Sequence, residues 1–168
     1  MYPIQFLLKD GQSVKIRPMQ MDDILAIDAM HDRLSKQSLY YRYFVPRKPS
    51  LDALQDQMRL SQYRGAALVA TLDSASNEII GMAYYLFTPN DASVAEPAFL
   101  IEDRFQGLGL GGALFKYLVR EALSQALRGF QLFVLPENRR MLKLLNHVRF
   151  NTERHYSHGV YEVCLSFQ

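Results

Sequence analysis

The feature that most constrains this chain is the segment QGLGLGG, Gln106 to Gly112, in which four of seven residues are glycine. It follows the apolar run FLI, residues 99–101, and precedes a helical pattern in which Leu114, Leu118 and Ala122 recur on one stripe. Glycine loses much conformational freedom on folding, so such a cluster needs a compensating role. A glycine-rich connection from a strand into a helix forms an anion site, because the first helical N–H groups are unpaired and the macrodipole adds positive charge. The segment therefore predicts a diphosphate site.

Three known kinds of glycine-rich turn compete for this segment. A P-loop requires Lys-Ser or Lys-Thr after its last glycine, whereas Ala113 follows Gly112 here. The dinucleotide fingerprint is formally satisfied by Gly107, Gly109 and Gly112, but EDRFQ separates it from its strand and only 56 residues follow. A turn that merely allows the helix and strand to pack remains an alternative.

The rest of the pattern predicts strands and helices in a mixed order. Residues 4–8 and 14–17 flank Asp10-Gly11 as a hairpin, and a second hairpin joins 66–72 to 79–87 through SASN. Strands are also predicted at 94–101, with a bulge or an edge at Pro97, at 130–135, and at the end around Tyr161–Phe167. Antiparallel hairpins followed by strand–helix–strand indicate a mixed α/β (α+β) fold.

The predicted helices begin at polar caps. Asp22 and Asp23 precede a helix carrying Ile24, Ile27, Met30 and Leu34, Ser50 precedes one with Leu51, Leu54 and Met58, and Asn138 begins one that runs to His147. The long helix after the glycines reaches about Leu127, and the aromatic run SLYYRYF, residues 38–44, is compatible with a second short helix.

Length and composition restrict the class of protein. The 168 residues fit one domain, 1–168, and a net charge of +2 argues against a nucleic-acid surface. The single cysteine, Cys164, excludes an internal disulfide and gives no metal-ligand spacing, so no metal is expected. MYPIQFLLKDGQ has neither the basic start nor the long apolar run of a signal peptide or membrane span. We therefore expect a cytoplasmic enzyme or binding domain with no membrane partner.

Several segments together resemble the GNAT superfamily of N-acetyltransferases. Gln106-x-x-Gly109-x-Gly111 resembles the acyl-CoA motif Q/R-x-x-G-x-G/A, and IRP with Asp22-Asp23 resembles the opening strand and helix of that family. FLI resembles its central strand, and FVLPENRRMLKLLNHVRF its last strand–helix block. SLYYRYF and AEPAFLIEDRFQGLGLG are most similar to bacterial protein lysine acetyltransferases that modify acyl-CoA synthetases. The resemblance implies a central, mostly antiparallel sheet flanked by helices, with acetyl-CoA as cosubstrate.

The resemblance also implies a role for each matched residue. Backbone groups of Phe99 and Ile101 would pair with the pantetheine arm as an added strand would. The diphosphate would be held by backbone N–H groups of Gln106, Gly107, Leu108, Gly109, Leu110, Gly111 and Gly112. Asn138 matches the asparagine that contacts the cofactor arm, and it is equally suited to be the N-cap of the following helix.

Two positions depart from the family pattern. The family often ends this block with Tyr-x-x-x-Gly-Phe, whereas this chain has Leu145, Arg149 and Phe150 there. The usual general-acid tyrosine is therefore absent, and a non-glycine residue occupies a position where φ > 0 is common. Catalysis is still feasible, because a thiol with a pKa of about 8.5 can depart as a thiolate with little help from an acid.

Glu96 is the expected general base. An amine with a pKa of about 10.4 is protonated at neutral pH and must lose a proton before it can attack a thioester. Glu96 matches the catalytic glutamate of the family by its AE-x-AF context, and the alternative is a solvated strand glutamate beside Pro97. Other groups that could react or bind are expected to have structural roles: Glu102 and Asp103 as loop charges, His147, His155 and His158 as surface or core residues, Cys164 as a buried small side chain, and Tyr40, Tyr41, Tyr43 and Phe44 as core.

The sequence therefore predicts an acetyl-CoA-dependent N-acetyltransferase that moves an acetyl group directly to a primary amine. The acceptor implied by the resemblance is a lysine on a folded protein, such as an acyl-CoA synthetase. The rival hypothesis is a regulatory domain that binds acyl-CoA without turnover, and the missing tyrosine keeps it open.

Overall fold

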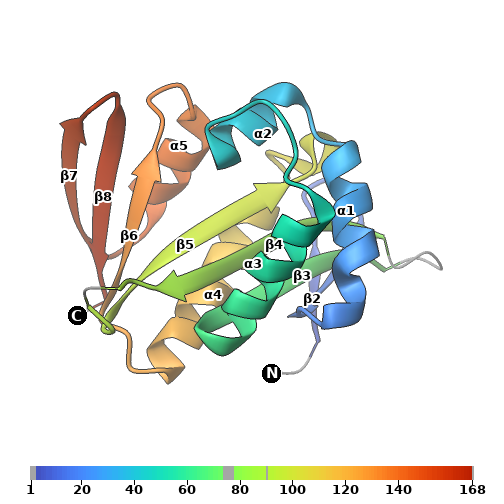
Figure 1. The fold of residues 1–168 in the computed structure, drawn as a ribbon, viewed down its shortest axis with the longest axis horizontal. Coiled ribbons are helices and arrows are strands. Elements are labelled where there is room, and N and C mark those ends of the chain that lie inside the picture. The colour runs from blue at the N-terminus through green and yellow to red at the C-terminus, as the bar shows by residue number, and fades with distance from the viewer. Residues whose placement is uncertain (1–2, 74–77, 90, 168) are drawn as a thin grey trace.

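The computed structural model describes residues 3–73, 78–89 and 91–167. Its strands form one eight-stranded sheet in the order β1-β2-β3-β4-β5-β6-β8-β7 (Figure 1). The strands are β1 Ile4–Leu7, β2 Ser13–Pro18, β3 Gly65–Leu72, β4 Ile79–Phe87, β5 Val94–Ile101, β6 Gly129–Val134, β7 Asn151–Ser157 and β8 Val160–Ser166. All neighbouring pairs are antiparallel except β5 with β6, which is parallel. The prediction of a mixed, mostly antiparallel sheet is confirmed.

Five α-helices cover the two faces of the sheet (Figure 1). They are α1 Ile24–Asp32, α2 Lys36–Tyr43, α3 Leu51–Tyr63, α4 Leu110–Ser124 and α5 Arg139–His147. Helices α1, α2 and α3 contact β3, β4 and β5 on one face, and α4 lies on the other. Leu145 of α5 belongs to the same buried cluster as Leu114 of α4, so α5 shares the α4 face. None of the helices in the described ranges is both long and apolar enough to cross a membrane.

Two buried clusters lie on either side of the sheet. The larger one joins α4 and α5 to the sheet, with Phe130 and Leu165 among its members. The smaller one joins α1 and α3 to β3, β4 and β5, and includes Met30 and Leu100. Because side chains alternate along a strand, membership of these clusters fixes which face each strand residue points to.

Most of the predicted helix starts are confirmed. Ser50 Oγ accepts from Ala53 N at 3.3 Å, Asn138 Oδ1 accepts from Met141 N at 3.2 Å, and SLYYRYF forms most of α2. Asp23 is the N-cap residue of α1, as expected, but its carboxylate makes no cap hydrogen bond to that helix. It accepts instead from the Arg17 guanidinium at 2.7 Å and from Gln20 N at 2.8 Å.

Two expectations about element boundaries need correction. Helix α4 ends at Ser124 rather than about Leu127, because Ala126 takes a positive φ of 59°. Leu34 is buried beyond the end of α1, and the predicted turn SASN, residues 74–77, lies outside the described residues. Strand β7 was not predicted. Its residues are mostly exposed, so the sequence lacks the apolar alternation by which a strand is detected.

Candidate functional site

The site forms where two neighbouring strands separate. Strands β5 and β6 pair only at Val94 with Gly129 and at Ala95 with Phe130, and beyond that point they diverge (Figure 1). Strand β5 nevertheless stays paired with β4 along its whole length. One edge of β5 is therefore unpaired by β6 from Glu96 onward, so its backbone groups on that side are not used in the sheet.

The backbone of β5 presents free groups to the gap that separates it from β6. Glu102 N donates to Ile80 O at 2.9 Å and Val94 O accepts from Thr88 N at 3.1 Å, so the even-numbered residues of β5 bond to β4. In an antiparallel pair the alternate residues point the opposite way. The N–H groups of Phe99 and Ile101 therefore face the gap. The carbonyl of Ile101 also faces it and accepts from Gln106 Nε2 at 2.8 Å. The nitrogen of Pro97 lies on the same side and carries no hydrogen.

Pro97 does not produce the bulge that was one of two expectations. The pairing of β4 with β5 continues through Tyr85 and Pro97 without a register shift. Pro97 instead lies on an open edge of β5, which was the second expectation, because its nitrogen, which carries no hydrogen, faces the gap. No ladder hydrogen bond is lost there.

The glycine segment passes directly into α4. Gly107 and Gly109 have φ values of 78° and 96°, and Gly109 is the N-cap of the helix. Within the residues that the structure describes, the backbone N–H groups of Gly107, Gly109, Gly111 and Gly112 donate to no protein acceptor. A 15-residue helix with free N–H groups at its start has the geometry that an anion site requires, and the diphosphate site itself stays a prediction.

Gln106 contributes to the site differently from the prediction. Its backbone N–H donates to Asp103 O at 3.2 Å and is not available to a phosphate. Its side chain instead donates to Ser38 Oγ of α2 at 3.0 Å and accepts from Arg140 of α5. Gln106 therefore links the glycine segment to the helices on both sides of the gap.

Two basic residues near the glycine segment were missed by the sequence analysis. Lys9 N donates to Leu108 O at 3.1 Å, and a Cβ placed on Gly109 would lie 4.0 Å from Lys9 Cε. Arg140 reaches the segment through Gln106. Neither residue is adjacent to the glycines in sequence, so only tertiary contact shows that both lie near the segment.

We predict that Lys9→Gln weakens acetyl-CoA binding by about threefold to fivefold, the effect of losing one exposed ion pair. Titration calorimetry at two salt concentrations would measure it, and the difference should shrink at high salt. Lys15→Gln is the matched control, because Lys15 lies on the same hairpin but pairs with Asp73 at 2.6 Å. Equal affinities for both variants at low salt would contradict the role of Lys9.

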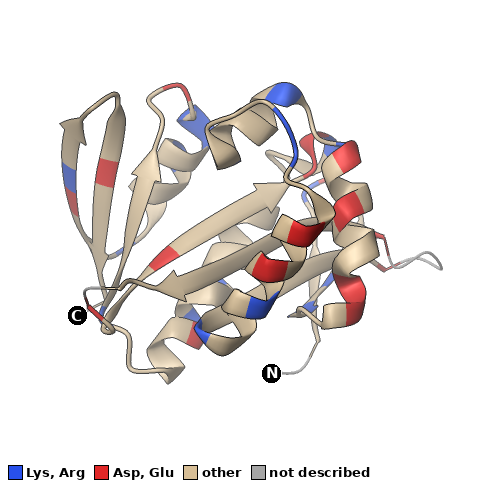
Figure 2. Cartoon of the chain, viewed as in Figure 1, with Lys and Arg blue, Asp and Glu red and all other residues tan. Residues whose placement is uncertain are grey.

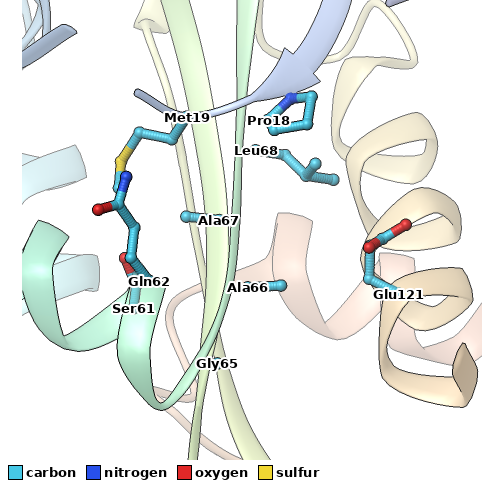
Figure 3. A pocket seen from close by; sticks show the side chains of 9 residues that line it. All are labelled: Pro18, Met19, Ser61, Gln62, Gly65, Ala66, Ala67, Leu68 and Glu121. Atoms are coloured by element: carbon cyan, nitrogen blue, oxygen red, sulfur yellow. The ribbon is translucent and has the colours of Figure 1, made fainter. Parts of the chain in front are cut away.

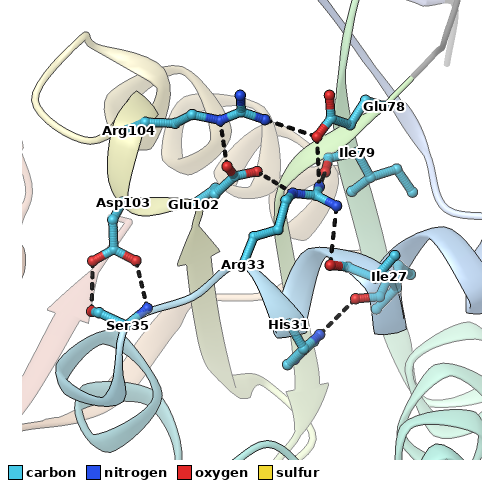
Figure 4. A network of polar contacts seen from close by, with 10 residues as sticks. Ile27, His31, Arg33, Ser35, Glu78, Ile79, Glu102, Asp103 and Arg104 are labelled. Atoms are coloured by element: carbon cyan, nitrogen blue, oxygen red, sulfur yellow. Dashed lines mark hydrogen bonds and ion pairs between the residues drawn. The ribbon is translucent and has the colours of Figure 1, made fainter.

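The residues just before the glycines form a polar network (Figure 4). Glu102 is only 3% exposed and accepts from Arg33 Nε at 2.9 Å and from Arg104. Asp103 accepts from Ser35 N at 2.9 Å and from Ser38 Oγ at 2.8 Å. Both residues lie in the connection between β5 and α4, as expected, and they are paired. Their ion pairs and hydrogen bonds hold the end of α1 and the start of α2 against the loop that leads to the glycines.

The hydrogen bonds to Asp103 shift its acidity. Burial acts to raise the pKa of Asp103, but hydrogen bonds from Ser35 and Ser38 outweigh it and leave the pKa below its ordinary value. A carboxyl group whose pKa is lowered in the folded state stabilises the fold at pH values above its ordinary pKa. This contribution is lost as the pH falls through the lowered pKa of the folded state. The attachment of α2 should therefore weaken only in acid.

We predict that Arg33→Met lowers the free energy of unfolding by about 2–3 kcal/mol, because it removes one partner of the buried Glu102 carboxylate. Urea denaturation would measure the change. Arg59→Met should change it by less than about 0.5 kcal/mol, since Arg59 and Asp56 are both exposed and lie 3.7 Å apart. Equal midpoints for the two variants would show that the Glu102 pair does not stabilise the fold.

Glu96 lies at the point where β5 leaves β6. It is exposed, and by alternation it points to the same face as Ala98 and Leu100, which contact α1 and α3. Arg42 of α2 lies on this face, donates to the Tyr84 hydroxyl, and has its guanidinium carbon 5.3 Å from the Tyr84 ring centroid. Burial lowers the pKa of Arg42, and the charges of Tyr43 and Glu96 partly oppose that shift. Glu96 is therefore a carboxylate beside the gap with a cation close by.

The family's acid position is filled by an apolar residue. Leu145 is 1% exposed and belongs to the core, so it supplies no proton. Arg149 is absent from the positive-φ residues of the described chain, so the missing glycine at this position introduces no backbone strain there. The Asn138 side-chain oxygen is used as the N-cap of α5, which confirms one of its two expected roles.

The remaining reactive groups are mostly more exposed than expected. Cys164 is exposed on β8, so the expectation of a buried small side chain is wrong. Tyr40 and Phe44 of the aromatic run are 40% and 44% exposed and do not belong to the core. His147, His155 and His158 are exposed, so the surface position that was one of the two expectations for them is confirmed.

A hollow of about 190 Å³ lies apart from the gap, at the start of β3 (Figure 3). Figure 3 shows Ser61 and Gln62 of α3 on one side of β3 and Glu121 of α4 on the other. Strand β3 is separated from the open edge of β5 by β4. This hollow therefore adds nothing to the candidate site.

Comparison with known proteins identifies the family. The model of the acetyltransferase (GNAT) family matches residues 30–149, which include β5, the glycine segment, α4, β6 and α5. The chain belongs to the acetyltransferase (GNAT) family. The predicted family is therefore confirmed, and with it the expectation of an acetyltransferase-type enzyme.

Individual relatives agree with this GNAT assignment. "Acetyltransferase Pat" of Mycolicibacterium smegmatis is 26% identical over 146 residues, which cover 87% of this chain and 44% of the relative. "Acetyltransferase PA5475" of Pseudomonas aeruginosa is 28% identical over 149 residues, 88% of this chain and 80% of the relative. The GNAT domain of S. lividans PAT superposes with a TM-score of 0.86 at 26% identity, covering 98% of this chain and 97% of that one. This GNAT chain thus spans less than half the length of the Mycolicibacterium protein.

Proposed function

We propose that this GNAT chain transfers an acetyl group from acetyl-CoA to a primary amine, and that the acceptor is a lysine on a folded protein. The observation that carries the proposal is the gap between β5 and β6, which has an anion site at one end and the Glu96 carboxylate at the other. In this proposal the open edge of β5 serves both requirements of the reaction, holding the CoA and deprotonating the amine.

The chain's own groups suit acetyl-CoA. The free N–H groups at the start of α4, with Lys9 and Arg140 close by, match a diphosphate. The N–H groups of Phe99 and Ile101 are positioned to pair with the amide groups of a pantetheine arm that lies along β5. In this arrangement the thioester lies near the point where the strands part, next to Glu96.

Direct transfer requires one proton acceptor. A lysine ammonium first loses a proton to Glu96, directly or through water, and the neutral nitrogen then attacks the thioester carbon. A C–N bond forms, the C–S bond breaks, and the sulfur leaves with its electron pair as CoA thiolate. The nitrogen then loses its second proton to that thiolate or to water, which gives the neutral amide. Because the thiol pKa is about 8.5, the missing general-acid tyrosine does not prevent the departure of the thiolate.

Two features support a protein acceptor. SLYYRYF and the segment around Glu96 resemble protein lysine acetyltransferases that modify acyl-CoA synthetases. Glu96 is also exposed, so the amine of a lysine held on the surface of another protein could reach it. A lysine on an acyl-CoA synthetase is therefore the first acceptor to test.

The test mixes the chain with acetyl-CoA and a panel of folded proteins, spermidine and an aminoglycoside. Release of free CoA thiol, together with a gain of about 42 Da in the mass of one protein of the panel, would support the proposal, because that gain corresponds to one acetyl group in place of one amine hydrogen. Binding of acetyl-CoA without CoA release from any mixture would favour the regulatory domain instead. Efficient reaction of spermidine with every protein unmodified would contradict the protein acceptor.

A further inference from the structure

Among the described residues, no helix covers the β6, β8 and β7 half of the sheet on the face that carries Glu96. Helices α1, α2 and α3 contact β3, β4 and β5, whereas β6, β8 and β7 stand free on that side in Figure 1. Phe130 and Leu132 of β6 point to the opposite face, into the core with α4. Gln131 and Phe133 therefore point to the uncovered face, and Phe133 is 45% exposed.

The uncovered face contains a hollow of about 490 Å³ next to the gap. Its lining includes Val94 at the start of β5, Gln131 of β6, Cys164 of β8 and Glu153 of β7. Val94 and Glu96 are alternate residues of one strand and thus point to the same face. A polypeptide whose lysine reaches Glu96 could place a neighbouring side chain in this hollow.

The hollow and its surroundings are negatively charged. Glu153 and Asp91 line the hollow. Glu162 lies on the same face, where its carboxylate accepts from Gln131 Nε2 at 2.5 Å. Figure 2 shows acidic positions on β5, β7 and β8. Arg128 also lines the hollow and lies 3.9 Å from Asp91. Burial, and then the charges of Glu162 and Glu153, raise the pKa of the Cys164 thiol.

We propose that this hollow and the face of β6, β8 and β7 around it bind the acceptor polypeptide, with a Lys or Arg side chain close to the acceptor lysine entering the hollow. The inference rests on the proposed function and adds a preference for basic sequence around the lysine. The partner is a cationic polypeptide because the charged lining of the hollow is two carboxylates, Asp91 and Glu153, against one guanidinium, Arg128. Glu162 adds a third carboxylate on the same face, and the exposed Phe133 beside it offers an apolar contact. An anionic nucleic acid would be repelled by the same face.

The single cysteine provides a direct test. Cys164 is the only thiol in the chain, it is exposed, and it lines the hollow. A bulky maleimide on Cys164 should lower acetylation of an acceptor protein by about tenfold or more, the effect of losing about 1.4 kcal/mol of docking energy. Acetyl-CoA affinity and acetylation of a small amine, such as ethylamine, should remain unchanged. Cys164→Ser treated with the same maleimide is the control and should keep full activity toward the protein.

The outcomes separate this proposal from the proposed function. Undiminished protein acetylation by the labelled enzyme would overturn the docking site while leaving the acetyltransferase intact. No transfer to any amine by the unlabelled chain would overturn the proposed function itself. A dimer in light scattering that the label dissociates would show that a second copy of this chain covers the face, and would overturn the acceptor site as well.

The charge preference has its own test. A peptide with Arg beside the acceptor lysine should have a kcat/KM about tenfold above that of the same peptide with Glu there. The double variant Glu153→Gln, Glu162→Gln should bring this ratio close to one. Glu137→Gln, an exposed glutamate in the turn before α5, should leave the ratio unchanged. A ratio that survives the double variant would overturn the charge-based part of the proposal.

Discussion

Glu96→Gln should lower turnover by about 10²–10⁴-fold, the usual contribution of a general base, while acetyl-CoA affinity barely changes. The amide keeps the shape of the side chain and loses the proton acceptor. Glu96 is exposed at the edge of the gap and belongs to no buried cluster, so the substitution should not disturb the fold. The rate of CoA release at saturating acetyl-CoA would measure turnover, and titration calorimetry would measure the affinity for acetyl-CoA.

The dependence of this effect on pH identifies its cause. The wild-type rate should rise with pH as more acceptor amine becomes neutral, and the variant should recover part of its rate at high pH, where deprotonation no longer needs Glu96. Glu137→Gln is the control and should behave as wild type. Full activity of Glu96→Gln at neutral pH would mean that another group or a water chain removes the proton.

Gly109→Val should weaken acetyl-CoA binding by about tenfold to a hundredfold with the fold intact. Gly109 has φ of 96°, where a β-branched residue is strained, so the segment would have to change conformation and turn its N–H groups away from the diphosphate. The space itself is not the obstacle, since a Cβ there would meet Phe6 at an ordinary 3.6 Å. Calorimetry with acetyl-CoA would measure the loss.

A second glycine supplies a matched control for backbone strain. Gly159, in the turn between β7 and β8, has φ of +84° and no atom within 4 Å of an added Cβ. Gly159→Val should lose comparable stability but keep its acetyl-CoA affinity. Unchanged affinity in a folded Gly109→Val protein would remove the glycine segment from the proposed binding site.

Local sequence signals placed most of the elements and the start of the candidate site. The glycines before α4, the side-chain caps at Ser50 and Asn138, and the alternating apolar strands act through neighbouring backbone groups, so they can be found without tertiary structure. The motif around Gln106 and its order between strand and helix led to the family that comparison confirmed. Strand β7 was missed because most of its residues are exposed.

What the chain's sequence determined by itself is the order of the segments to which the proposed chemistry is assigned: a strand with Glu96, a glycine segment and a capped helix. Only the tertiary structure decided that β5 and β6 part after Ala95, that Lys9 reaches Gly109, that Glu102 is buried between two arginines, and that Cys164 lies exposed on an uncovered face. The physical reason is the separation along the chain of the residues that determine each feature. Caps, turns and alternation depend on residues a few positions apart, whereas strand separation, ion-pair burial and the exposure of a face depend on which distant segments fill the neighbouring space.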